Sequence, residues 1–136
     1  MTPEEALKVK SLTDRSDIFN YVVDHLRKQG KQSLLQAENN CAYRGDGGTM
    51  CAVGCLMTDD EYHPSCEGNT IEFLLWETTL APSLKERVKP NFAMLMDLQN
   101  FHDSNLQYED GTFTESCELY ISELRKKWNI KKSSAV

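Results

Sequence analysis

The chain lacks any apolar run of the roughly 20 residues that a membrane-spanning helix needs, because charged residues, 26% of the total, interrupt every hydrophobic stretch. It also lacks a basic stripe, since 15 lysines and arginines stand against 21 acidic residues and leave a net charge of −6. Nucleic-acid binding depends on clustered cations, so the composition argues against it. The start Met1–Glu5 is acidic and has no apolar signal-peptide segment. We therefore expect a cytoplasmic protein that does not associate with membranes.

A disulfide framework is also not expected. The five cysteines are an odd number, and without a secretory signal the compartment is a reducing one, where free thiols or a metal site are the usual fates of cysteine. The length of 136 residues fits a single domain, 1–136, with a short polar tail at about 131–136. A chain of this size buries roughly 68% of its unfolded surface, enough for a real core.

Helices account for most of the predicted structure, and the expected class is α+β, mainly helical, with a short central β-hairpin packed against the helices. Capping boxes, prolines and apolar spacing predict helices at Pro3–Lys10, at Asp17–Gln29 with Ser16 as cap, from Thr70, from Ser83, after Pro90 to about His102, and from Thr112 onward. The second and last helices should pack on the hairpin and place Val22, Leu26, Ile121 and Leu124 in the core.

The hairpin is expected between Cys41 and Cys51, with Asp46-Gly47 at its turn, because Asp-Gly between strand-like runs is a strong turn signal. Strands this short need helices against them to be stable. A two-residue turn would set Arg44 opposite Thr49, which points Cys41 and Cys51 to opposite faces.

Residues that could form a site or a tight turn are concentrated between Cys41 and Gly68, a stretch that holds four of the five cysteines and five of the seven glycines. A zinc site would draw its ligands from Cys41, Cys51, Cys55, His63 and Cys66. The small apolar run around Cys51 and Cys55 instead favours buried structural thiols, and we expect neither metal nor cofactor. A nucleophilic Cys51 at a helix N-terminus is a further alternative.

Polar and aromatic residues cluster around the tight turns of the same stretch, and loops on rigid scaffolds often carry function. The predicted binding patch consists of Tyr43, Arg44, Asp46, Asp59, Asp60, Tyr62, His63 and Glu67. The structural alternative is that Arg44 forms an ion pair with Asp59, Asp60 or Glu67 and only stabilises the corner, by which we mean the tight turns between Tyr43 and Glu67. No set of residues typical of a catalytic site stands out, so an enzyme is not the favoured interpretation.

The centre of the chain, roughly Ile18 to Gly68, resembles an uncharacterised group of small proteins from tailed bacteriophages and prophages. The resemblance rests on His25-Leu26, Gln29–Ser33, Cys41–Gly45, Cys51–Gly54, Leu56, Asp59–Tyr62, Pro64 and Glu67-Gly68. It implies a phage accessory protein, made in the cytoplasm of an infected bacterium, that binds and inhibits or modulates a host or defence protein, with a homodimer as one arrangement. The alternative from a different class is a small enzyme or nucleotide-binding protein that uses the Cys41–Glu67 segment.

Overall fold

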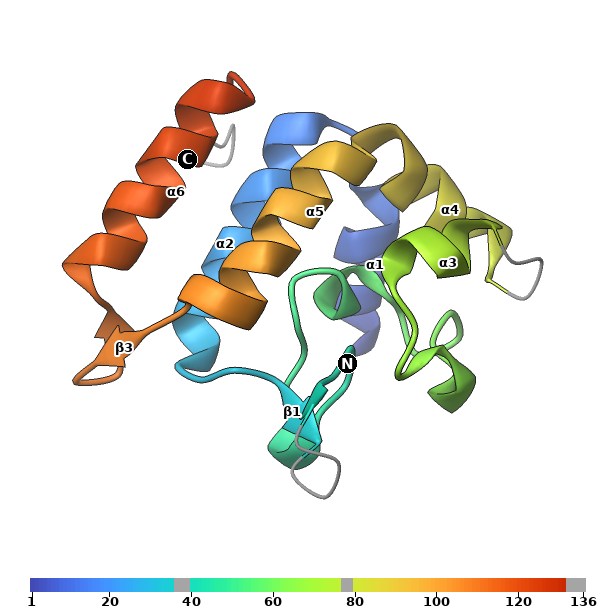
Figure 1. Ribbon diagram of the computed structural model, residues 1–136. Helices are drawn as coiled ribbons and strands as arrows, with labels where there is room; N and C mark the ends of the chain where they lie inside the picture. Colours follow the sequence, from blue (N-terminus) through green and yellow to red (C-terminus); the bar gives the residue numbers. More distant parts are fainter. Residues whose placement is uncertain (36–39, 77–79, 132–136) are drawn as a thin grey trace.

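The computed structural model describes residues 1–35, 40–76 and 80–131, and it confirms a mainly helical α+β architecture (Figure 1). The α-helices are α1 (Pro3–Ser11), α2 (Arg15–Gln29), α3 (Ile71–Trp76), α4 (Pro82–Val88), α5 (Phe92–Asn100) and α6 (Glu115–Lys127). Short 3₁₀ turns are η1 (Asp46–Gly48), η2 (Gly54–Leu56), η3 (Pro64–Cys66) and η4 (Lys89–Asn91), and one π-helical turn is η5 (Phe101–Asn105). The strands are β1 (Leu34–Leu35), β2 (Asn40–Cys41), β3 (Tyr108–Glu109) and β4 (Thr112–Phe113).

Helices α2, α5 and α6 form one side of the molecule, and α3 and α4 lie at the opposite end (Figure 1). The four residues expected in the core are buried, with exposed fractions of 0% for Val22 and Leu26, 2% for Ile121 and 7% for Leu124. Helix α2 contacts η2 in the centre of the chain and also β4, whereas α6 contacts β4, the partner of β3 in a second antiparallel pair. In the described part of the chain, no helix has the length and apolarity to cross a membrane.

Side-chain caps begin α1, α2 and α6, although three caps differ from the prediction: α4 begins at Pro82 after Ala81 and has no capping side chain, so the capping box expected at Ser83 is wrong. Thr2 caps α1 as expected. Helix α2 begins earlier, because Asp14 rather than Ser16 accepts the first N–H groups. Helix α6 is capped by Thr114 rather than Thr112. Thr112 belongs to β4, and its hydroxyl donates to the Glu109 carbonyl across the β3–β4 turn.

The hairpin register predicted from Asp46-Gly47 is wrong. Arg44 pairs with Met50 through an isolated bridge, and Thr49 belongs to a longer loop in which its hydroxyl donates to the Asp46 carbonyl at 2.9 Å. Gly47 and Gly48, at φ of 70° and 77°, allow the η1 turn that lengthens the loop. Cys41 pairs instead with Leu34, in the small sheet of β1 and β2.

The stretch from Cys51 to Thr58 is buried at every residue, although it forms only the η2 turn. Gly54 is required there, because a Cβ atom at that position would lie 2.0 Å from the Tyr43 carbonyl oxygen. We call Met50–Thr58 the buried segment. An irregular backbone at the centre of a protein carries N–H and C=O groups that need partners.

Candidate functional site

Glu67 lies at the centre of the predicted patch and binds three groups of its neighbours. Its carboxylate accepts hydrogen bonds from the backbone N–H of Tyr43 at 2.9 Å, the backbone N–H of Arg44 at 3.0 Å and the hydroxyl of Tyr62 at 2.7 Å. Burial and the neighbouring Glu67 raise the pKa of Tyr62, so the phenol keeps the proton that it donates. The structure therefore brings Tyr43, Arg44, Tyr62 and Glu67 together.

The Arg44 side chain is also engaged through its terminal nitrogens and its guanidinium face, whereas its Nε is buried without a hydrogen-bond partner among the described residues. It forms an ion pair with Asp59 at 2.8 Å and donates to the Met57 carbonyl at 3.0 Å. Its guanidinium lies 4.6 Å from the centre of the Tyr62 ring, a cation–π contact. These contacts match the alternative in which Arg44 fastens the corner, with Asp59 as its partner.

The remaining predicted residues lie at the edge of this network. Asp60 accepts from the Thr58 hydroxyl at 2.6 Å and from Lys10 at 2.9 Å, and these two contacts lower its pKa to about 2. Asp46 is exposed in η1. His63 is exposed and begins η3, where its Nδ1 accepts from the Ser65 N–H at 3.1 Å.

A buried ion pair next to this corner has no counterpart in the predicted patch. Arg87 of α4 binds both carboxylate oxygens of Glu61, at 2.9 and 3.3 Å, and the two side chains are only 4% and 1% exposed. Arg87 also donates to the Leu56 carbonyl at 2.7 Å, and Glu61 accepts from the Thr58 N–H at 3.0 Å. Burial raises the pKa of Glu61, but the hydrogen bonds from Arg87, Ser83 and Thr58 outweigh it and leave the pKa lowered.

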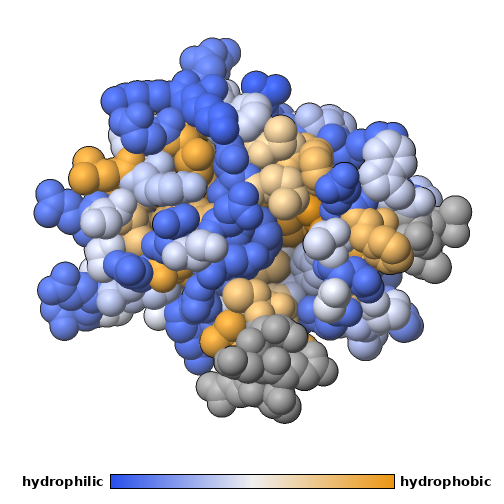
Figure 2. Space-filling model, viewed as in Figure 1, coloured by the Kyte–Doolittle hydropathy of each residue, from blue (hydrophilic) through white to orange (hydrophobic). Residues whose placement is uncertain are grey.

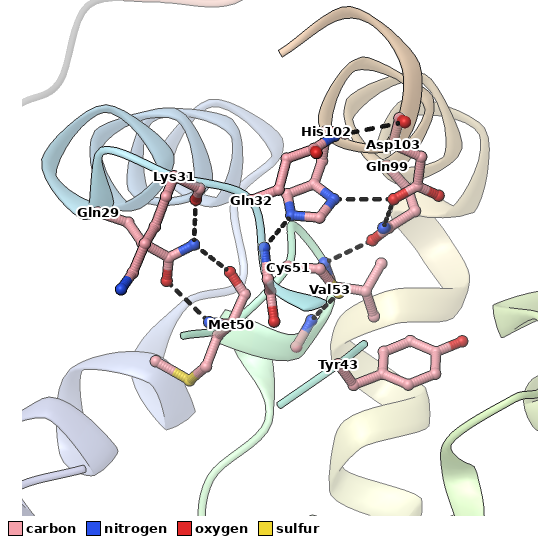
Figure 3. A network of polar contacts seen from close by, with 12 residues as sticks. Gln29, Lys31, Gln32, Tyr43, Met50, Cys51, Val53, Gln99, His102 and Asp103 are labelled. Carbon is pink, nitrogen blue, oxygen red and sulfur yellow. Dashed lines mark hydrogen bonds and ion pairs between the residues drawn. The ribbon is translucent and has the colours of Figure 1, made fainter. Parts of the chain in front are cut away.

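Two glutamines, Gln29 and Gln99, and a histidine, His25, form hydrogen bonds with the backbone of the buried segment, and Figure 3 shows the two glutamines. The Gln29 side chain pairs with Met50 like a neighbouring strand, accepting its N–H at 2.7 Å and donating to its carbonyl at 3.0 Å. His25 donates to the same carbonyl at 2.9 Å, and burial lowers its pKa. Gln99 of α5 accepts the Val53 N–H at 3.1 Å. Polar side chains thus replace secondary structure around this backbone.

All five cysteines are free thiols. Cys51 accepts the Gly54 N–H at 3.3 Å, and Cys55 donates to the Ala52 carbonyl at 3.1 Å. Burial raises the pKa of Cys51 to about 12 and that of Cys55 well above its ordinary value, so both thiols are protonated. The burial of Cys51 and its contact with the Gly54 N–H favour a structural thiol over a nucleophile.

The zinc ligands suggested by the sequence do not gather. Among the described residues, the group of three or more histidine, cysteine or acidic side chains placed to share an ion is Cys41, His102 and Asp103. Of the suggested set it contains only Cys41. His102 and Asp103 belong to η5, where the sequence indicated no more than a helix end.

His102 is fully buried, and its two ring nitrogens have different partners (Figure 3). Nε2 accepts the Ser33 backbone N–H at 3.0 Å, and Nδ1 lies 2.8 Å from an Asp103 carboxylate oxygen. Because a backbone N–H can only donate, the ring proton is on Nδ1 and is donated to Asp103. The same carboxylate accepts a hydrogen bond from Gln99 at 2.8 Å and is hydrogen-bonded to the Cys41 thiol. Burial and the negative charge of Asp103 raise the pKa of this thiol to about 11.

A pocket of about 230 Å³ is lined by residues of η3, α3 and the end of the buried segment. Its lining residues are Met57, Glu61, His63, Ser65, Cys66, Asn69, Phe73, Leu74 and Leu80. Phe73 and Trp76, one turn apart on α3, are 50% and 75% exposed. Figure 2 shows an apolar area over α3, beside the grey residues 77–79.

Some of these residues left a weak signal in the sequence. Gln99 follows Leu95 by four positions and Arg87 follows Leu84 by three, so both stand at core-facing spacing on apolar helices. A polar residue there needs an internal partner. The identity of that partner could not be read from spacing. The chain has no counterpart in the comparisons: no protein-family model matches it, and no curated protein or solved structure is significantly similar to it.

Proposed function

We propose that this protein is a non-enzymatic phage accessory protein that binds and blocks a host or defence protein in the infected bacterium. The observation that carries the proposal is the exposed aromatic pair Phe73 and Trp76 beside the pocket at η3. Tryptophan is among the residues that dominate binding energy at interfaces, and it does so when an adjacent hollow takes a side chain of the partner. Of the predicted patch, His63 lines this pocket and would belong to the interface.

The charge of the chain suggests the character of the partner. With a net charge of −6, the protein would associate fastest with a basic surface, because opposite charges steer encounter. Asp59 and Asp60, the exposed acidic residues near η3 in sequence, are paired with Arg44 and Lys10, so the steering comes from the net charge of the whole chain. The partner is thus expected to present an apolar side chain on a surface of net positive charge.

Affinity capture from the infected bacterial host tests the proposal with three proteins: wild type, Trp76→Ala and Leu119→Ala. Leu119 is the matched control, since it is an apolar side chain of α6 with 62% exposure, away from the pocket. A partner recovered by the wild type is then purified and its affinity measured by calorimetry. Loss of a hot-spot tryptophan should weaken binding by roughly 30-fold or more, and loss of Leu119 should not.

Three outcomes would contradict the proposal. Repeated recovery of no specific partner would remove the claim of a binding protein. A partner whose affinity falls equally for Trp76→Ala and Leu119→Ala would show that the α3 surface is not the interface. Turnover of a small molecule, lost on substitution of a pocket residue, would favour the enzyme alternative.

A further inference from the structure

We propose that Cys41, His102 and Asp103 form an open site for a divalent transition-metal ion of the zinc or cobalt type. One ligand atom from each residue lies within 4.8 Å of the other two. The residues come from β2 and η5, which are far apart in the sequence, so the juxtaposition is a product of the fold. Single π-helical turns such as η5 occur frequently at functional sites.

The donor set selects the class of ion. Thiolate, imidazole and carboxylate together are the ligands of zinc and of similar borderline cations, whereas magnesium and calcium take oxygen ligands. Three protein ligands leave one tetrahedral position vacant, as in sites that bind water or a substrate rather than purely structural ones. Burial agrees with this arrangement, because His102 is fully buried while Cys41 and Asp103 reach solvent.

Neighbouring polar groups already hold two of the three ligand residues, His102 and Asp103. Gln99 donates to the Asp103 carboxylate at 2.8 Å, and Gln32 donates to the His102 backbone carbonyl at 2.7 Å (Figure 3). Outer partners of this kind fix ligand geometry and tune metal affinity. Both glutamine contacts are present before an ion binds, so these parts of the site need little ordering when binding occurs.

Binding would rearrange protons in a defined way. An ion on Nδ1 of His102 moves the ring proton to Nε2, so the Ser33 N–H, 3.0 Å away, must give up that acceptor. The thiol of Cys41 releases its proton to solvent. The metal-free cluster is hydrogen-bonded as it stands, so the fold does not depend on the ion and binding should be reversible.

Cobalt(II) is the probe, because a cysteine thiolate bound to it gives a sulfur-to-metal charge-transfer band in the near ultraviolet. Wild type, Cys41→Ser and Cys66→Ser are titrated with cobalt, and zinc is then added in competition. Cys66 is the control, as a buried thiol outside the cluster. The expected result is a band that saturates at one ion per chain, disappears on adding zinc, is absent in Cys41→Ser and is retained in Cys66→Ser.

A second measurement uses the unsubstituted protein, so its result cannot be changed by a variant that fails to fold. Nitrogen-15 NMR of the intact protein should show His102 changing from the Nδ1–H to the Nε2–H tautomer on zinc addition, together with a shift of the Ser33 amide. The absence of a thiolate band at saturating cobalt would overturn the proposal, as would a band that survives in Cys41→Ser. An unchanged His102 tautomer in zinc-saturated protein would overturn it as well.

Discussion

The buried segment Met50–Thr58 and the surface of α3 around Phe73 and Trp76 differ in how their side chains are used. Around the segment, Arg44, Arg87 and Glu61 direct hydrogen bonds to its backbone groups, and Arg87 and Glu61 also pair with each other. On α3, the aromatic side chains of Phe73 and Trp76 are exposed. Polar density in a sequence therefore identifies backbone that needs partners as readily as it identifies a binding surface.

Arg87→Ala should have the largest effect on stability and would show whether the polar groups of the corner are structural. It leaves the Glu61 carboxylate buried and unpaired and removes a donor from the Leu56 carbonyl. Breaking a buried ion pair in this way costs about 3–5 kcal/mol of unfolding free energy. Urea denaturation measures it, with Lys85→Ala, another cation of α4, as the control. Equal stability for the two variants would contradict the role assigned to Arg87.

Acid should weaken the same region. Hydrogen bonds hold the pKa of Glu61 below its ordinary value of 4.5 in the folded protein. A lowered folded-state pKa contributes stability that is present above the unfolded-state pKa and is lost as pH falls through the folded-state pKa. Unfolding free energy should thus decline below about pH 4.5. Denaturation between pH 3 and pH 7 should show a flatter decline in Glu61→Gln than in the wild type; parallel curves would exclude Glu61 as a source of the acid sensitivity.

Arg44→Ala separates the two interpretations of the predicted patch. The variant loses the Asp59 ion pair, the Met57 carbonyl bond and the contact with Tyr62. Because the side chain is 25% exposed and Asp59 is 59% exposed, the ion pair itself is screened by solvent. We expect a loss of about 1–2 kcal/mol, mainly from the unsatisfied carbonyl and lost packing. Thermal melts beside the capture assay decide the role: a normal melt with lost partner binding would make Arg44 a binding residue after all.

Trp76→Ala should have the smallest effect on stability, and it tests whether the aromatic side chains of α3 are surface residues rather than part of the core. With 75% of its surface exposed, the indole contributes little to the core. The change in unfolding free energy should stay within about 0.5 kcal/mol, as for most surface substitutions. Circular dichroism melts measure this, and a loss similar to that of Arg87→Ala would show that the aromatic pair of α3 belongs to the interior.

The sequence by itself determined the helical content, the caps of α1 and the end of α2, the core positions Val22 and Leu124, and the burial of Cys51 and Cys55. These features depend on local chemistry, namely side-chain caps, apolar spacing and residue size, which act within a few positions along the chain. It also located the corner around Glu67, because turn residues and polar groups are concentrated there.

Only the tertiary structure decided which polar groups meet. The Arg44–Met50 register depended on how a glycine loop closes, and the partners of Arg87 and Gln99 are 26 and 46 positions away along the chain. Cys41, His102 and Asp103 come together because the fold brings the end of β2 close to η5. Such contacts are selected by the packing of whole elements and by the need of each buried N–H and C=O group for a partner, and neither is encoded in local spacing.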